Sequence, residues 1–206
     1  MLIIRNSLFA IGRLFSYLCS PKMLYGYTNV ASILYAGFVT IRFQKVGLNF
    51  RVYPPIHMNE CNNIAIGDNV VLGREVILYT THEKRKLPYI IIGNNVNIGD
   101  YCHISSYNHI NIGDNVLIGR YVSIIDNSHG ENSEQDICIS PAKRSIISKG
   151  EIIVEDNVWI GEKVMILGNV VIGRNAIIGA HSVVNRDVPP YTIVAGIPAR
   201  VVKEIK

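Results

Sequence analysis

A repeat of six residues runs through most of this 206-residue chain and constrains its fold more than any other feature. An aliphatic residue returns at every sixth position in three runs, over residues 66–78, 92–104 and 112–124, and again over 154–184, and it is often followed by glycine. A period of six fits neither a helix nor a plain strand alternation. It predicts short strands joined by corners and stacked as a solenoid, with three hexads in each triangular coil.

The spacing of the coils shows where residues are inserted. The predicted coils start at Val46, Ile66, Ile92, Ile112, Val154 and Ile172. Successive starts are 20, 26, 20, 42 and 18 residues apart, whereas an uninterrupted coil needs 18. Every extra residue therefore follows the third hexad, at one and the same corner. The longest insertion, predicted at residues 130–153, begins directly after His129, and solenoids commonly place function on the side that carries insertions.

Composition narrows the classes of function. Hydrophobic residues make up 49% of the chain and charged residues 17%, which suits the continuous apolar interior of a solenoid. The net charge of +4 is dispersed and forms no basic stripe, which disfavours nucleic-acid binding. Four cysteines lack the spacing of a zinc site or a disulfide framework, so we expect a cytoplasmic protein without a metal.

Residues 1–45 are predicted to form a helical cap. Five apolar residues recur there at helical spacing: Ile4, Leu8, Ile11, Phe15 and Leu18. Arg5 and Arg13 interrupt this segment, which leaves too short an apolar run to span a membrane. Such a helix covers the open end of a solenoid, lies on a membrane surface as a peripheral contact, or contacts another subunit.

The remaining chain divides into a solenoid over residues 46–189 and a C-terminal tail over residues 190–206. Pro189 and Pro190 mark this boundary, because proline cannot donate to a strand ladder.

Residues 156–200 read DNVWIGEKVMILGNVVIGRNAIIGAHSVVNRDVPPYTIVAGIPAR. This segment closely resembles the carboxyl-terminal signature of the hexapeptide-repeat acyltransferases, a family that includes sugar O-acetyltransferases, and the resemblance extends over residues 46–203. It implies an all-β fold, namely a left-handed parallel β-helix of about six triangular coils with an N-terminal helical cap and a long loop at one corner. It also implies a homotrimer that uses acetyl-CoA as the acyl donor and needs no metal.

In this family the general base is a histidine next to the loop that precedes the NVWIG motif. The matching segment here is SIIDNSHG, residues 123–130, which resembles the branch acting on cell-surface sugars and makes His129 the candidate base. An alcohol is a poor nucleophile until a base removes its proton, and imidazole titrates near neutral pH. The alternative for His129 is a solvent-facing corner residue.

Three further residues are candidates for the acceptor side of the site. Asp126 is expected to orient the imidazole or bind an acceptor hydroxyl, or else to be a corner carboxylate. Asn127 is a candidate acceptor ligand. His109 occupies the sixth place of its hexad, as His129 does, one coil earlier, so it either stacks beside His129 or lines the acceptor site.

The resemblance also assigns residues to the coenzyme. Trp159 would lie against the pantetheine arm and exclude water from the thioester, or would simply pack. Gly161, Gly179 and Ala180 would let coenzyme A pass along the corners through backbone hydrogen bonds, or would serve tight turns. Nearer the nucleotide end, the candidates are Asn185, Arg186 and Arg200, each with a solvated surface role as the alternative.

The expected function is therefore transfer of an acetyl group from acetyl-CoA to a hydroxyl of a sugar or surface-polysaccharide precursor. Alternatives are an amino-sugar N-acetyltransferase, an antibiotic acetyltransferase and a non-catalytic trimeric scaffold. Antibiotic-modifying members usually carry a His-Pro pair, whereas Gly130 follows His129 here. A metalloenzyme of the carbonic-anhydrase type is disfavoured, because its paired histidines are five residues apart while His103 and His109 are six apart.

Overall fold

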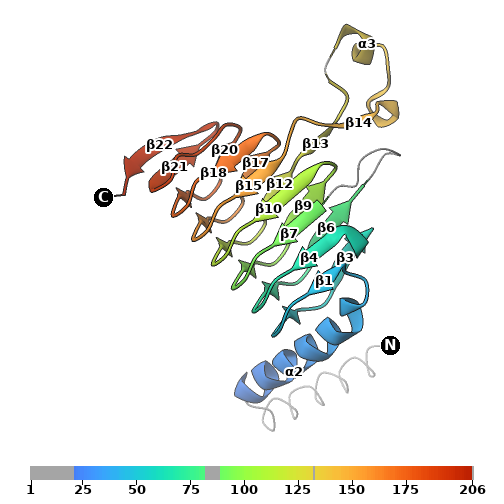
Figure 1. Cartoon of the computed structure of the whole chain (residues 1–206), viewed down its shortest axis with the longest axis vertical. Helices are drawn as coiled ribbons and strands as arrows, with labels where there is room; N and C mark the ends of the chain where they lie inside the picture. The colour runs from blue at the N-terminus through green and yellow to red at the C-terminus, as the bar shows by residue number, and fades with distance from the viewer. Residues whose placement is uncertain (1–20, 82–88, 132, 206) are drawn as a thin grey trace, which may run out of the picture.

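A computed structural model describes residues 21–81, 89–131 and 133–205. Three sheets run along a solenoid of six stacked coils (Figure 1). The first sheet contains β1 (Lys45–Val46), β4 (Ile64–Ile66), β7 (Tyr89–Ile92), β10 (His109–Ile112), β15 (Ile152–Val154) and β18 (Val170–Ile172). The second contains β2 (Arg51–Val52), β5 (Val71–Leu72), β8 (Asn97–Ile98), β11 (Leu117–Ile118), β16 (Trp159–Ile160), β19 (Ile177–Ile178), β21 (Thr192–Gly196) and β22 (Ala199–Glu204). The third contains β3 (Ile56–Asn59), β6 (Val76–Thr80), β9 (His103–Ser106), β12 (Ser123–Ile125), β17 (Met165–Leu167) and β20 (Val183–Val184).

The aliphatic position of each hexad points inward and stacks in register with its counterpart in the next coil. In the first sheet this column contains Ile66, Ile92, Ile112, Val154 and Ile172, all at most 1% exposed. The six-residue period therefore predicted both the strands and the core. A column of branched aliphatic side chains is what short parallel strands need to bury against one another.

The corner between the first and second sheets is held by stacked asparagines. Asn69, Asn95 and Asn115 adopt left-handed backbone angles, with φ of 57°, 56° and 58°. The side-chain amide of Asn69 donates to Asn95 Oδ1 at 2.9 Å, and that of Asn95 donates to Asn115 Oδ1 at 3.0 Å. Asparagine tolerates this backbone region better than other side chains, so the corners repeat without glycine at this place.

Insertions leave the solenoid where the third sheet passes to the first, as the coil spacing predicted. The largest forms an excursion that spans residues 126–151 and stands away from the solenoid (Figure 1). It contains β13 (Asn127–His129), α3 (Glu134–Ile137), the 3-10 helix η2 (Pro141–Lys143) and β14 (Ile146–Ser148). A second 3-10 helix, η1 (Cys61–Asn63), lies at the same corner of an earlier coil.

The predicted loop bounds, 130–153, are displaced in the structure. The excursion begins before His129, because β13 and β14 pair as an antiparallel hairpin. Its end comes earlier than predicted, because Ile152 and Ile153 already pair with Val170 and Val171 in the first sheet.

Helix α2 (Pro21–Thr40) covers the N-terminal end of the solenoid. Ala36 and Val39 are buried in the core, and the Tyr53 hydroxyl donates to Asn29 Oδ1 at 2.8 Å. The predicted helical stripe of residues 4–18 lies outside the described residues. Within the part of the chain that the structure describes, no helix has the length and apolar character needed to cross a membrane.

The C-terminal segment extends the second sheet beyond the predicted boundary at residue 189. Strand β21 pairs in parallel with β19, and β22 returns antiparallel to β21. The predicted tail of residues 190–206 is therefore mostly strand. The strand pattern resumes after Pro189 and Pro190 because Ile193 and Val194 stack on Ile177 and Ile178.

Candidate active site

A groove of about 590 Å³ runs along the outer face of the second sheet, beside the corner that leads to the third sheet. Three outward side chains stand in register along it: Leu117, Trp159 and Ile177. Trp159 is 51% exposed, so its indole is an apolar surface that a ligand can reach. The groove therefore offers an elongated apolar wall rather than a polar cleft.

The corner beside this groove lacks large side chains because the coils pack closely there. A Cβ on Gly161 would lie 2.7 Å from the backbone nitrogen of Ala180, a distance that real side chains do not adopt. The N–H groups of Gly161 and Gly179 donate to Ile178 O and Val194 O, each at 2.8 Å. These two amides belong to the solenoid ladder, so hydrogen bonds from the corner to a ligand must come from other groups.

The groove unites four of the predicted coenzyme residues: Trp159, Gly161, Gly179 and Ala180. Sequence reasoning missed other residues that line it, among them Leu117, Glu162, Ile177 and His181. A signal for two of them was present. Leu117 and Ile177 occupy the same hexad position as Trp159 in the adjacent coils, and strand register places that position on one outward face.

The remaining predicted coenzyme residues lie elsewhere. Asn185 and Arg186 line a separate hollow of about 300 Å³ at the corner between the third and first sheets, with Glu151 and Asn169. Arg200 lies on β22, where its Nη1 donates to the carbonyl of Ala199 at 2.7 Å. The predicted set is thus divided among three places in one chain.

His129 ends strand β13 and is exposed at the root of the excursion. It pairs with Ile146 of β14, and the N–H of the following Gly130 donates to Ser145 O at 2.9 Å. Among the described residues, no side chain makes a hydrogen bond to the His129 imidazole. The ring is therefore accessible from solvent, while the backbone that carries it is fixed by the hairpin.

Asp126 is 1% exposed, and its carboxylate is engaged by the preceding coil. It accepts the N–H groups of Tyr107 at 2.7 Å, Asn108 at 2.9 Å and His109 at 3.1 Å. The Ser106 hydroxyl donates to it at 3.0 Å. Burial raises the pKa of Asp126, and these hydrogen bonds act in the opposite direction. The carboxylate thus holds a turn together rather than contacting the imidazole of His129.

The backbone of Asp126 also joins the excursion to the solenoid. Its N–H donates to Ser105 O at 3.4 Å, and its carbonyl accepts the N–H of Lys149 at 3.3 Å. The side-chain amide of the next residue, Asn127, donates to Ser105 Oγ at 3.2 Å. Both residues therefore anchor the hairpin that carries His129.

His109 does not stack on His129 in register, because His129 has left the coil. Its ladder partner is Tyr89, whose ring meets the imidazole edge-to-face with centroids 6.3 Å apart. His103 lies on the third sheet and thus on another face, as expected. Burial lowers the pKa of His103, and its Nε2 has no hydrogen-bond partner among the described residues.

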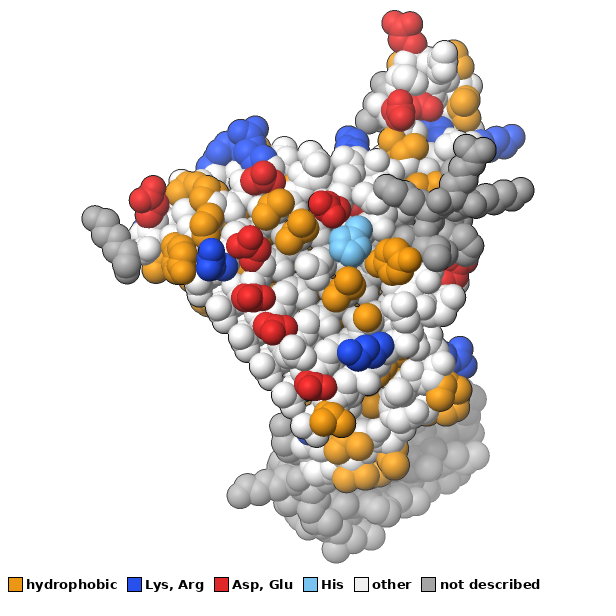
Figure 2. Space-filling model, viewed as in Figure 1, with side chains coloured by type: hydrophobic (Ala, Val, Ile, Leu, Met, Phe, Trp, Pro, Cys, Tyr) orange, Lys and Arg blue, Asp and Glu red, His pale blue; other side chains and the backbone are white. Residues whose placement is uncertain are grey.

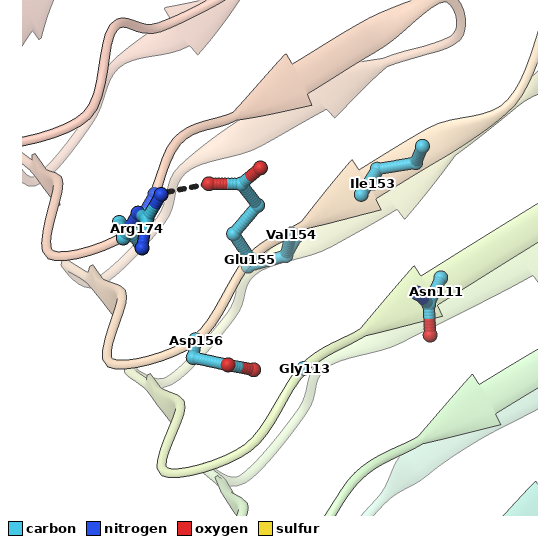
Figure 3. A pocket seen from close by; sticks show the side chains of 7 residues that line it. All are labelled: Asn111, Gly113, Ile153, Val154, Glu155, Asp156 and Arg174. Carbon is cyan, nitrogen blue, oxygen red and sulfur yellow. Dashed lines mark hydrogen bonds between the residues drawn. The ribbon is translucent and has the colours of Figure 1, made fainter.

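A third hollow, of about 280 Å³, lies beside the corner between the first and second sheets (Figure 3). Its carboxylates serve the backbone of neighbouring coils. Glu155 accepts the N–H of Arg174 at 2.7 Å, and Asp156 accepts that of Asp114 at 2.8 Å. These hydrogen bonds join adjacent coils, which accounts for the acidic side chains that line this hollow.

The six-residue period, the triangular coils and the small residues at one corner define a hexapeptide-repeat protein. Residues 151–186 match the family model described as bacterial transferase hexapeptide (six repeats). The chain is 34% identical over 118 residues to the putative lipopolysaccharide biosynthesis O-acetyl transferase WbbJ of Escherichia coli (strain K12), covering 56% of this chain and 60% of that protein. The solved structure of galactoside acetyltransferase in complex with coenzyme A is similar at a TM-score of 0.57 and 30% identity, covering 82% of this chain and 69% of that chain.

A shorter match is closer in sequence. Over 54 residues the chain is 65% identical to the 2,3,4,5-tetrahydropyridine-2,6-dicarboxylate N-acetyltransferase of Thermotoga sp. (strain RQ2), covering 26% of this chain and 23% of that protein. The chain thus spans less than a quarter of that relative's length. Together, fold and comparisons show that the chain belongs to the hexapeptide-repeat transferase family and that its solenoid is the expected left-handed parallel β-helix.

Proposed function

We propose that this protein is an acetyl-CoA-dependent O-acetyltransferase that modifies a hydroxyl of a sugar or surface-polysaccharide precursor. The proposal rests on the presence of a candidate base and a candidate donor groove in the same fold. A histidine suited to act as a base is exposed at the root of the excursion, and a groove suited to an apolar donor runs along the second sheet. The O-acetyltransferase relative and the solved structure with coenzyme A support this pairing.

The groove fits the donor by shape and chemistry. A pantetheine arm is long and mostly aliphatic, and the register of Leu117, Trp159 and Ile177 gives it a continuous apolar surface. The bare corner at Gly161 lets such a chain approach the backbone. Trp159 would keep water from the thioester and so limit its hydrolysis.

His129 supplies the base. Its imidazole takes the proton of the acceptor hydroxyl as that oxygen forms a bond to the thioester carbonyl carbon. A backbone N–H stabilises the oxyanion of the tetrahedral intermediate. When the carbon–sulfur bond breaks, the imidazolium returns the proton to the departing thiolate, so no proton is gained or lost by the protein. The hairpin β13–β14 fixes the position of the base during these steps.

The same geometry supports a homotrimer with sites shared between neighbouring chains. Within one chain, His129 leaves from the corner between the third and first sheets, whereas the groove borders the corner between the second and third sheets. A site assembled from two chains brings the base of one chain to the groove of the next. Arg186 and Arg200 then remain candidates for the nucleotide end of the donor. Consumption of acetyl-CoA and three free cysteines among the described residues suit a cytoplasmic enzyme.

Near the base, His109 and Asn127 are the candidate acceptor contacts, because both lie at the corner from which the excursion leaves. Asp126 acts on the acceptor side through the turn that it holds, not through direct contact. A second candidate function is N-acetylation of an amino sugar; the match over 54 residues to an N-acetyltransferase supports transfer to an amine, although that relative is named for a dicarboxylate and not for a sugar. An amine acceptor needs the same donor groove and a base at the same place.

The test is release of free thiol from acetyl-CoA in the presence of free, nucleotide-linked and lipid-linked sugars, each offered with a hydroxyl or an amine at the same carbon. We expect a hydroxyl acceptor to stimulate release. His129→Ala should lower turnover by roughly 10²–10⁴-fold, because the proton then has no positioned acceptor.

His57→Ala provides the matched control, because His57 is half exposed on the third sheet and pairs with Glu75 at 2.8 Å. It should keep turnover within about twofold of the wild type. Equal activity of the His129 variant and the wild type would remove His129 from the mechanism. Stimulation by amines alone would replace O-acetylation with N-acetylation.

A further inference from the structure

Helix α2 carries a stripe of exposed apolar side chains on the side away from the solenoid. Its members and their exposed fractions are Tyr27 (74%), Val30 (57%), Leu34 (71%) and Phe38 (66%), and it continues at Ile41 (87%), the first residue after the helix. On the face shown in Figure 2, hydrophobic side chains gather at this end of the molecule. A contiguous exposed apolar surface of this kind marks a contact with something other than water.

Helical geometry separates this α2 stripe from the core. Its residues follow one another at intervals of three or four, so they share one face of the helix. Ser32, Ala36 and Val39 lie on the opposite face, where they are at most 3% exposed against the end of the solenoid. Packing against the solenoid therefore accounts for one face of α2 but not for the apolar side chains exposed on the other face.

The charged residues near the stripe in the sequence are all basic. The first acidic residue of the chain is Glu60, and residues 1–59 contain six basic residues: Arg5, Arg13, Lys22, Arg42, Lys45 and Arg51. The other 147 residues contain 14 basic residues and all 16 acidic ones. Arg42 and Lys45 are exposed directly after Ile41, where the stripe ends. Within the part of the chain that the structure describes, Arg42 and Lys45 thus place positive charge beside the end of the stripe.

We propose that the α2 stripe docks this protein on an anionic membrane surface, with the helix lying in the plane of the interface. Apolar side chains enter the boundary between headgroups and acyl chains, while nearby Lys and Arg side chains attract anionic headgroups. A second copy of the chain fits less well, because pairing two such ends brings their basic side chains together. This surface only attaches the protein to a membrane, so the docking proposal does not depend on which reaction the groove supports.

The experiment is sedimentation of the full chain with vesicles of phosphatidylcholine containing about 30% phosphatidylglycerol, compared with phosphatidylcholine alone. We expect binding to the anionic vesicles that falls at least about fivefold when sodium chloride is raised to about 0.5 M, because salt screens the attraction of Arg42 and Lys45. Equal binding to both vesicles, or to neither, would overturn the proposal.

Two double variants locate the contact. Leu34→Ser with Phe38→Ser should raise the half-saturating lipid concentration at least about tenfold, because two inserted side chains are lost. The matched control is Ile197→Ser with Val202→Ser, which changes two side chains of similar exposure, 75% and 67%, at the other end of the chain. It should bind vesicles like the wild type, and a loss as large as that of the α2 variant would contradict docking through α2.

Light scattering tests the rival occupant of the stripe, which is a second copy of the chain. If the Leu34 and Phe38 variant lowers the molar mass in the absence of lipid, the stripe joins copies of the chain and membrane docking is overturned. Turnover of a water-soluble acceptor by the same variant should equal that of the wild type. A protein that binds vesicles without transferring acetyl groups would therefore retain this docking surface while the proposed function fails.

Discussion

The solenoid and the excursion of residues 126–151 are stabilised by different kinds of contact. In the solenoid each strand is fixed by neighbours many residues distant in sequence, as when Ile124 stacks between Ile104 and Ile166. In the excursion, beyond the β13–β14 hairpin at its root, the side-chain contacts are short-range. Asp136 accepts the N–H groups of Glu131 at 2.6 Å and Ser133 at 3.3 Å. We therefore expect the solenoid to provide most of the stability, while the excursion carries His129, the proposed base.

The two regions also differ in burial. Solenoid positions alternate between fully buried and outward side chains, whereas α3 contains no buried residue. A region without buried apolar side chains contributes little to global stability, and it opens locally at low cost. In the proposed site, a donor groove on the rigid solenoid would therefore face an acceptor side carried by the more adaptable excursion.

The largest effect on stability is expected from a core truncation in the solenoid. Ile124→Ala removes a side chain of 0% exposure and should lower the free energy of unfolding by about 2–5 kcal/mol. Ile137→Ala, in α3, changes a side chain that is 73% exposed and should cost less than about 0.5 kcal/mol. Urea denaturation of both variants measures the contrast. Similar losses would show that the excursion shares the global core.

A smaller effect is expected at Asp126, where the two regions meet. Asp126→Asn places an N–H donor among backbone N–H groups that need an acceptor, and it should lower the free energy of unfolding by about 1–3 kcal/mol. Turnover should also fall, because the turn at Tyr107–His109 and the root of the hairpin lose their anchor. Unchanged stability would contradict the anchoring role.

The pH dependence of stability provides a second readout for Asp126. Burial raises its pKa above the ordinary value of 3.8, so between those two values the folded state holds more protons than the unfolded state. The contribution of this group to stability is therefore complete below about pH 3.8 and is lost as the pH rises through the raised pKa. Asp126→Asn cannot titrate and should lack this decline in urea denaturation at successive pH values.

The smallest effect is expected inside the excursion. Ser133 caps α3 by accepting the N–H of Asp136 at 3.3 Å. Ser133→Ala should destabilise this short helix by about 1 kcal/mol and speed amide hydrogen exchange within residues 133–139. Exchange in the solenoid strands should stay unchanged. Faster exchange in both regions would show that they unfold together.

Sequence alone predicted what depends on the repeat. The inward aliphatic positions, the six coils and the corner that carries insertions all follow from the six-residue period, whereas the exposed position of Trp159 was expected only from the family resemblance, with packing as the alternative. The same period identifies Leu117 and Ile177 as neighbours of Trp159, although only the structure shows the groove that they share.

What the sequence could not predict lies where the period stops. The hairpin begins at Asn127 because β13 pairs with β14. This pairing joins residues at least 17 positions apart, and the six-residue period does not predict it. The turn at residues 107–109 takes the carboxylate of Asp126, so the expected link to His129 does not form. Arg186 and Arg200 share a family motif with Trp159, yet they lie outside its groove, because Arg186 follows β20 at the corner between the third and first sheets and Arg200 lies on β22.

Mixed trimers test most directly whether the excursion of one chain and the groove of another form one site. His129→Ala removes the base, and Ala180→Phe fills the groove, so each variant should be inactive by itself. In any trimer that contains both variants, a single interface pairs an intact histidine with an intact groove, and purified mixed trimers should recover about one third of wild-type turnover. Mixed trimers that are folded but inactive would contradict a site shared between chains.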